Sequence, residues 1–313
     1  MQFTLGITGD LLTNEGNPCF GVQPLEALYK EKILVEWMDP DIKILSEKET
    51  SKYDAILLNS PRLTKESINP KNNKVKIVSR FGVGYDSVDL DVLKKNKIIL
   101  TNTPNAVRRP VAVASLTMIL SLSGKLMIKD NLVRKGLWNE RTNHMGVGLI
   151  NKTLGIVGFG GIGREFVKIS KGLFKNIICY DPFVSKEEMK NLQVDKVDFD
   201  QIANSSDFLV ILCDLNENTR GMIDSTFLNK MKSSSYLINL SRGPVVNEND
   251  LIASLKQNKI SGAGLDVMTN EPIEENNELL NLKNTILTPH SLCWTDECFD
   301  SIAAEAITSI LNY

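Results

Sequence analysis

The amino-acid sequence predicts an α/β protein made of two doubly wound, parallel-sheet domains of the Rossmann-like kind. Short β-rich runs alternate with helical patterns from end to end, which is typical of parallel strands joined by crossover helices. A glycine-rich turn also links an apolar strand to a helix near the middle of the chain, a second feature of such sheets. The runs predicted as strands are Phe3–Thr8, Ala55–Leu58, Val75–Val78, Ile98–Leu100, Leu154–Val157, Ile177–Tyr180, Phe208–Leu212, Tyr236–Leu240 and Thr285–Pro289.

The order of these elements divides the chain into two domains. At 313 residues the chain is long enough for two hydrophobic cores. Thr103-Pro104 closes the first series of strands, and a second series begins at Thr153. Between them the apolar pattern predicts one long, buried helix from Val111 to about Lys135. The first, flavodoxin-like domain is expected to comprise residues 1–102 and 293–313, and the second, Rossmann domain residues 103–292.

Composition excludes several classes of function. The 36 basic and 38 acidic side chains give a formal net charge of −2, so no polycationic surface for nucleic acid is expected. The five cysteines show no C-x-x-C spacing, which disfavours a disulfide framework and a zinc site, and no metal is predicted. No basic leader and no run of about 20 apolar residues is found, so we expect a cytoplasmic protein without a membrane partner.

A dinucleotide-binding fingerprint, G-x-G-x-x-G, follows the strand at Leu154–Val157. Gly158 permits the tight turn, Gly160 lets the backbone approach a pyrophosphate, and Gly163 allows the helix to pack closely on the strand. The next strand ends in Asp181, whose carboxylate can accept hydrogen bonds from ribose hydroxyls and would repel a 2′-phosphate. A plain strand–helix turn is the alternative, but the pattern favours NAD as cofactor. The residues predicted to bind it here are Gly158, Gly160, Gly161, Ile162, Gly163 and Asp181.

Charged and titratable residues follow apolar strands in the second half of the chain. His290, one of only two histidines, comes directly after Thr285–Pro289, and Arg242 follows the run that ends at Leu240. Asp266 and Glu271 follow another apolar segment. Each of these charges taken alone is more often a solvated surface residue. Together they indicate a ligand site, because ligands bind at the carboxyl ends of strands in parallel sheets.

In these motifs the chain resembles the D-isomer-specific 2-hydroxyacid dehydrogenase family, which includes phosphoglycerate, glyoxylate/hydroxypyruvate and D-lactate dehydrogenases. The motifs occur in the family's order and spacing over nearly the whole length. The matching segments are Arg80–Asp89, Asn102–Asn105, the glycine turn with Asp181, Asn239–Gly243, Gly264–Pro272 and Thr288–His290. The resemblance implies an active-site cleft between the two domains and an NAD-dependent hydride transfer to or from a small 2-oxo or 2-hydroxy acid.

The resemblance also implies roles for individual residues. Arg242 would bind the substrate carboxylate and polarise the 2-oxo group, and His290 would act as the general acid and base. Glu271 would hydrogen-bond the imidazole and favour its protonated form. Asp266 would hold the nicotinamide carboxamide. The remaining implied contacts are the backbone near Leu240 and Cys213, together with Arg242 and His290, for the cofactor, and the backbone N–H groups of Val83 and Gly84 for the substrate.

One segment departs from the family pattern. Val113 stands where many relatives have a glutamate in the first turns of the long helix. Because this segment borders the cleft in the family, Arg108 or Arg109 is a candidate to bind a second anionic group on the substrate, such as a phosphate. Paired surface arginines often have no such role. Trp294 either walls the substrate pocket or caps the last helix.

Partners and rival functions follow from the same resemblance. The long helix after Pro110 is expected to pair two copies of the chain into a homodimer. The first rival is an NAD-sensing protein that binds partners on this scaffold, as the family's transcriptional corepressors do, and the short chain without tails disfavours it. The second rival is a dehydrogenase of the same fold that acts on a non-acid substrate such as phosphite.

Overall fold

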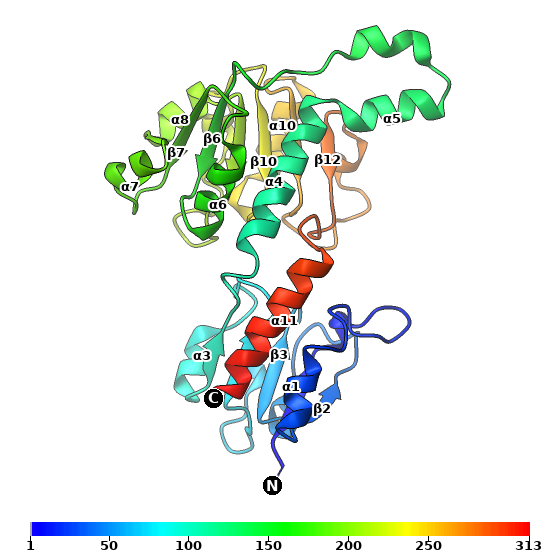
Figure 1. Ribbon diagram of the computed structural model, residues 1–313, viewed down its shortest axis with the longest axis vertical. Helices are drawn as coiled ribbons and strands as arrows, with labels where there is room; N and C mark the ends of the chain where they lie inside the picture. The colour runs from blue at the N-terminus through cyan, green and yellow to red at the C-terminus, as the bar shows by residue number, and fades with distance from the viewer. Residues whose placement is uncertain (1) are drawn as a thin grey trace. The chain divides into compact units, whose positions relative to one another are not determined.

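The computed structural model describes residues 2–313 and divides into two compact units. Unit 1 is formed by the chain up to Val107 together with Trp294–Tyr313, and unit 2 by Arg108–Cys293. Each unit contains one sheet whose paired strands all run parallel. Helices pack against the strands in both units (Figure 1). The predicted class, two parallel-sheet α/β units, is therefore confirmed.

Unit 1 has five strands in the order β2-β1-β3-β4-β5. The central strand β3 is buried at every position because its run Ala-Ile-Leu-Leu is covered on both faces. Helices α1 and α11 pack together, and α11 lies against β3 and β4. The elements are β1 Thr4–Ile7, β2 Leu34–Trp37, β3 Ala55–Leu58, β4 Ile77–Arg80, β5 Ile99–Thr101, α1 Leu25–Lys30, α2 Glu47–Lys52, α3 Leu90–Lys95, α11 Asp296–Leu311, and the 3₁₀ turns η1 Gly9–Leu11 and η2 Lys65–Ser67.

Unit 2 has seven strands in the order β12-β11-β10-β9-β6-β7-β8. The direction of strand addition reverses between β6 and β9, which is where parallel sheets of this kind bind nucleotides. The strands are β6 Thr153–Val157, β7 Asn176–Tyr180, β8 Asp195–Lys196, β9 Phe208–Ile211, β10 Tyr236–Asn239, β11 Gly262–Leu265 and β12 Thr285–Leu287. The helices and 3₁₀ turns are α4 Arg108–Ser123, α5 Leu126–Arg134, η3 Trp138–His144, α6 Gly161–Ser170, α7 Lys186–Asn191, α8 Phe199–Ser205, α9 Ser225–Leu228, η4 Gly243–Val245, α10 Glu248–Lys256 and η5 Glu278–Asn281.

Two separate apolar clusters cover the two faces of the sheet of unit 2. Along β9, Leu209 and Ile211 belong to one cluster, and Phe208 and Val210 belong to the other. Successive side chains of a strand point to opposite faces, so this run of apolar residues is buried on both sides. The continuous apolar pattern is thus explained by a strand between two helical layers.

The single long helix predicted from Val111 to about Lys135 is wrong. The chain forms α4 and α5 instead, bent by 57° at a break between Ser123 and Leu126. Lys125 adopts a left-handed conformation at the break, and the Val147 N–H group donates to the Ser123 carbonyl at 2.8 Å, which caps the end of α4. Within residues 2–313 no single helix is long and apolar enough to cross a membrane; only the bent α4–α5 pair meets that criterion, by length and composition alone.

Candidate active site

The glycine turn between β6 and α6 has the shape that a pyrophosphate site requires. Gly158 has a φ of +101°, and a Cβ atom there would lie 2.7 Å from the Cys213 backbone nitrogen. A Cβ at Gly163 would lie 2.4 Å from the Gly158 carbonyl oxygen, whereas one at Gly160 would meet nothing within 4 Å. Gly158 and Gly163 are therefore needed for folding, and Gly160 faces open space at the N-terminus of α6. The exposed N–H groups of that helix end fit a phosphate-bearing cofactor.

Asp181 lies at the end of β7 and fixes the shape of this turn. Its Oδ2 atom accepts a hydrogen bond from the Phe159 N–H at 2.8 Å, and Oδ1 accepts one from the Phe183 N–H at 2.9 Å. Each carboxylate oxygen can accept a further hydrogen bond, so ribose hydroxyls remain possible donors. The sequence did not indicate that Asp181 also holds the glycine turn.

Cys213 follows β9, which pairs with β6 across the reversal point, and Leu240 follows β10, the next strand beyond β9. Leu240 is buried. Burial is the largest influence on the Cys213 thiol and raises its pKa to about 12, with nearby Asp214 and Asp181 acting in the same direction. The thiol therefore stays protonated and lines the turn without acting as a nucleophile.

His290 and Glu271 form a hydrogen-bonded pair at the carboxyl ends of β12 and β11. The His290 Nδ1 atom lies 2.8 Å from Glu271 Oε2, and Glu271 Oε1 accepts from the Met268 N–H at 3.0 Å. Burial raises the pKa of Glu271, but the hydrogen bond and charge of His290, the Met268 N–H and the charge of Arg242 together lower it below its usual value. An ionised carboxylate only accepts hydrogen bonds, so Nδ1 carries the proton in this pair and Nε2 is the ring nitrogen that does not contact Glu271.

Asp266 holds the segment that carries His290. Its buried Oδ1 atom accepts from the Thr288 hydroxyl at 2.6 Å and from the Ser291 and Leu292 N–H groups at 3.1 Å each. Burial raises the pKa of Asp266, and these donors oppose that effect. The sequence did not predict this role, and it leaves Oδ2 available for the carboxamide contact that the resemblance implies.

Arg242 follows β10 on a loop that Asn239 folds. The Asn239 Oδ1 atom accepts from the N–H and hydroxyl groups of Ser241, its Nδ2 group donates to the Arg242 carbonyl at 3.0 Å, and the Arg242 Nη1 group donates to the Ser241 carbonyl at 2.8 Å. A Cβ at Gly243 would lie 1.9 Å from the Met268 carbonyl oxygen. The loops that carry Arg242 and Glu271 are therefore in direct backbone contact, and the charge of Arg242 reaches the Glu271 carboxylate.

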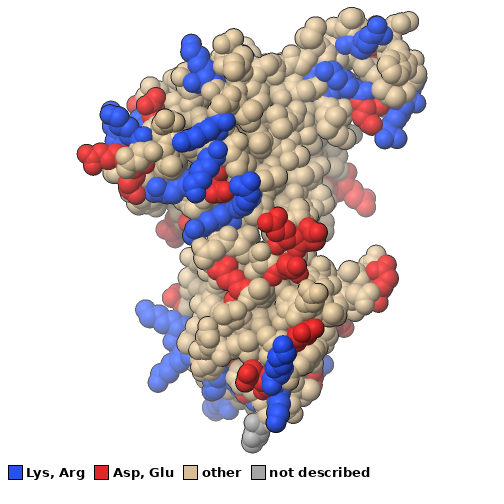
Figure 2. Space-filling view, in the orientation of Figure 1, with Lys and Arg blue, Asp and Glu red and all other residues tan. Residues whose placement is uncertain are grey.

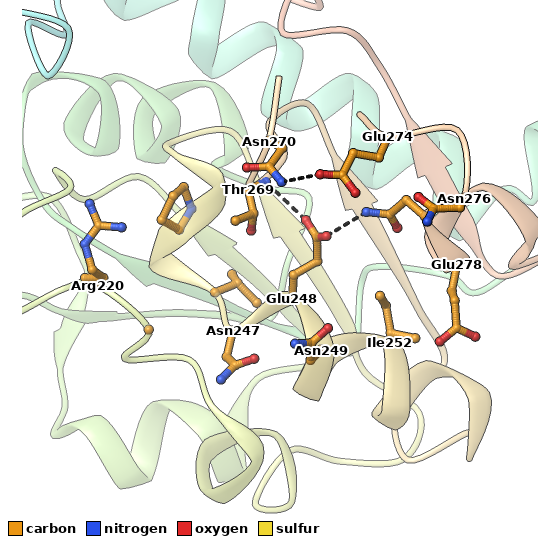
Figure 3. Close-up of a pocket in the computed structure, with 14 residues that line it drawn as sticks. Arg220, Asn247, Glu248, Asn249, Ile252, Thr269, Asn270, Glu274, Asn276 and Glu278 are labelled. Atoms are coloured by element: carbon orange, nitrogen blue, oxygen red, sulfur yellow. Dashed lines mark hydrogen bonds between the residues drawn. The ribbon is translucent and has the colours of Figure 1, made fainter. Parts of the chain in front are cut away.

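A polar pocket of about 520 Å³ lies beside these loops (Figure 3). At its centre the Glu248 carboxylate accepts from the Thr269 N–H at 3.1 Å and from Asn277 Nδ2 at 2.7 Å. Neither Glu271 nor His290 lines the pocket, so it is not where the proposed acid–base pair would meet a ligand. Glu248 instead supports the loop that leads to Glu271, a contact that no sequence motif indicated.

Val83 and Gly84 lie in unit 1, on the loop that follows β4. The Val83 carbonyl accepts a hydrogen bond from Asn102 Nδ2 at 2.8 Å, which joins the motifs Arg80–Asp89 and Asn102–Asn105. Trp294 is also in unit 1 and is about half exposed; its ring lies 5.0 Å from that of Phe299, which contacts Phe81 edge-on. Trp294 thus packs on the start of α11 and, through these rings, on the loop that carries Val83.

Arg108 and Arg109 begin α4 in unit 2, and the structure places both beside α6. Arg109 Nη1 forms an ion pair with Glu165 at 3.0 Å. The Arg108 guanidinium covers Gly161, because a Cβ at Gly161 would lie 2.5 Å from Arg108 Nε. Both side chains are exposed.

Comparisons with known proteins identify the family. Residues 116–291 match the model of the NAD binding domain of the D-isomer specific 2-hydroxyacid dehydrogenases. The chain belongs to this family, as its motifs predicted, and the predicted cofactor, NAD, is confirmed by the same match.

Individual relatives agree with this assignment. The chain is 35% identical to the glyoxylate reductase of Thermococcus litoralis over 302 residues, which is 94% of this chain and 90% of that protein. It is 33% identical to the D-3-phosphoglycerate dehydrogenase of Archaeoglobus fulgidus over 265 residues, 85% of this chain but only 50% of that protein. The chain thus spans about half the length of this phosphoglycerate dehydrogenase. Among solved structures, D-lactate dehydrogenase from Aquifex aeolicus, complexed with NAD and lactic acid, superposes with a TM-score of 0.86 at 26% identity, covering 98% of this chain and 94% of that one.

The glycine turn yields a prediction that separates its two roles. Gly160→Ala should leave the thermal unfolding midpoint unchanged but weaken NADH binding about tenfold, because the added methyl group projects into the open space above the helix end. Gly163→Ala should lower the free energy of unfolding by about 1–3 kcal/mol, because the methyl group meets the Gly158 carbonyl. NADH fluorescence titration and urea unfolding measure the two effects. Equal loss of stability in both variants would contradict the division of roles.

Proposed function

We propose that the chain is an NAD-dependent dehydrogenase that transfers a hydride between the nicotinamide ring and C2 of a small 2-oxo or 2-hydroxy acid. The observation that carries the proposal is the His290–Glu271 hydrogen bond of 2.8 Å, with the charge of Arg242 acting on the same carboxylate. These three residues follow neighbouring strands, β12, β11 and β10, in the unit that contains the glycine turn. They supply a proton donor, its anionic partner and a permanent cation.

The proton is exchanged at His290 Nε2 in this proposal. The Nδ1 proton is held by the Glu271 carboxylate, which leaves Nε2 as the nitrogen that gives a proton to the 2-oxo oxygen and takes it back in the reverse direction. When bound, the nicotinamide cofactor supplies or accepts the hydride. While Nε2 carries its proton, the Glu271 carboxylate offsets the positive charge of the imidazolium.

Arg242 is proposed to bind the substrate carboxylate. The planar guanidinium of Arg242 is always charged and can donate two parallel hydrogen bonds to a carboxylate. Asn239 holds the loop that presents it. The N–H groups of Val83 and Gly84 are the further donors that the proposal assigns to the substrate, and Asp266 Oδ2 is the acceptor assigned to the carboxamide.

A substrate panel tests the reaction class. Purified protein should oxidise NADH with one or more of glyoxylate, hydroxypyruvate, pyruvate, branched 2-oxo acids and phosphohydroxypyruvate, and should use NADPH poorly because of Asp181. His290→Gln should lower kcat about 100-fold or more with NADH binding retained. The decrease in NADH absorbance measures turnover. Absence of turnover with every acid, or turnover with phosphite alone, would overturn the proposal.

The lowered pKa of Glu271 gives a pH prediction. Because its pKa is lowered, the carboxylate stays ionised at neutral pH and remains an acceptor for the Nδ1 proton of His290. Glu271→Gln removes this charge at every pH, so kcat/KM for reduction should be lower at neutral pH and should lose the fall that protonation of Glu271 gives the wild type at acidic pH, below the usual carboxyl range. Glu274→Gln is the matched control, since that carboxylate bonds to Asn270 and not to His290. An unmoved profile in Glu271→Gln would refute the coupling.

A homodimer formed through α4, α5 and the following segment is also proposed. Helix α4 packs on α6, β10 and β11, whereas α5 and the following segment form an arm that extends from unit 2 (Figure 1). Several apolar side chains of this arm are more than half exposed. Such a surface favours burial against another protein. The exposed apolar residues of the arm are Leu126, Met127, Val133, Trp138, Met145 and Ile150.

Light scattering tests the arm. Wild-type protein should have twice the mass of one chain, and Trp138→Asp should shift the protein toward monomer because it places a charge within the apolar surface. Phe183→Asp, at an even more exposed aromatic outside the arm, should remain dimeric. A monomeric wild type would end the dimer proposal.

A further inference from the structure

Basic side chains gather around the N-terminal end of α6 and the start of α4, as Figure 2 shows on one face of unit 2. Most of these cations form ion pairs with carboxylates. Glu165 pairs with Arg109 at 3.0 Å and with Lys168 at 3.2 Å, and Arg164 pairs with Glu188 at 3.1 Å. The guanidinium of Arg108 has no hydrogen bond and no ion pair with any residue in the described range 2–313.

Arg108 is held above the phosphate-binding end of the helix without being neutralised there. Its Nε, Cδ and Cζ atoms lie 2.5–3.1 Å from the position that a Cβ of Gly161 would take. Gly161 is the first residue of α6, directly after Gly160, whose outer face is open. Helix α4 packs along α6, so the backbone of Arg108 is anchored to the same unit as the turn. The absence of a side chain at position 161 is what makes room for the guanidinium.

We propose that Arg108 is a cofactor-binding residue that donates hydrogen bonds to the pyrophosphate of NAD, opposite the N–H groups of α6. The inference rests on the NAD-binding assignment and adds a residue to it. A helix end provides dipoles and N–H donors but no full charge. A guanidinium at this point supplies one positive charge and donors with a geometry that matches phosphate oxygens. Arg108 thereby serves the cofactor rather than a second anionic group on the substrate.

The ion pair between Arg109 and Glu165 distinguishes Arg109 from Arg108 as a candidate to bind the pyrophosphate. Glu165 lies one turn into α6 and forms an ion pair with the guanidinium of Arg109, so a carboxylate of the protein already balances that charge. A ligand phosphate would have to compete with this carboxylate for Arg109 but not for Arg108. The two neighbours therefore provide a test residue and a matched control in one helical turn.

Competition binding distinguishes the roles without turnover. NADH binding is followed by its fluorescence, and ADP-ribose, which carries the pyrophosphate, and adenosine, which lacks it, are titrated as competitors. Arg108→Ala should bind ADP-ribose about five- to tenfold more weakly, a modest loss because the side chain is exposed, and should bind adenosine as wild type does. Arg108→Lys should recover part of the loss, and Arg109→Ala should change ADP-ribose affinity less than about twofold.

The outcomes separate this proposal from its rivals. Failure of the wild-type protein to bind NADH would refute the assignment of NAD as cofactor, on which this proposal rests. Unchanged ADP-ribose binding in Arg108→Ala, or a matching loss of adenosine binding, would overturn the proposal, the latter because it would mean that Arg108 merely shapes the turn. A raised KM for phosphohydroxypyruvate with unchanged ADP-ribose affinity would likewise overturn it and assign Arg108 to the substrate.

Discussion

The hydrogen bonds that converge on Asp266 hold the proposed acid–base residue in place. His290 has a φ of +54°, in the left-handed region that residues other than glycine rarely adopt and that costs about 1–3 kcal/mol. Such a conformation persists only where surrounding contacts determine it. The Thr288 hydroxyl and the Ser291 and Leu292 N–H groups flank His290 and all donate to one buried oxygen of Asp266. The buried carboxylate is costly by itself, and these donors offset that cost.

Backbone packing, more than side-chain contact, sets the spacing between the other two loops. Gly243 leaves no room for a side chain beside the Met268 carbonyl, so the loop after β10 touches the loop after β11. Glu248 then holds the second loop from behind through the Thr269 N–H group. The backbone positions from which Arg242 and Glu271 project are therefore fixed relative to each other.

The sequence predicted those parts of the fold in which local pattern and burial agree. Strands covered on both faces, such as β3 and β9, appear as continuous apolar runs and were found. The edge strands β2 and β8 were missed because their partly exposed residues show no such run. The break between α4 and α5 was also missed: the Val147 N–H group that caps Ser123 comes from a distant segment, and local periodicity carries no information about it.

The same distinction applies to the candidate site. Strand-end position and residue type were enough to select Arg242 and His290, because parallel strands bring their carboxyl ends to one edge. Spacing along the chain could not connect Arg108 with Gly161, which only the packing of α4 on α6 brings together. The glycines of one motif thus differ in their physical reason. Gly158 is required by its backbone conformation, whereas Gly161 provides the space that a cation from another helix occupies.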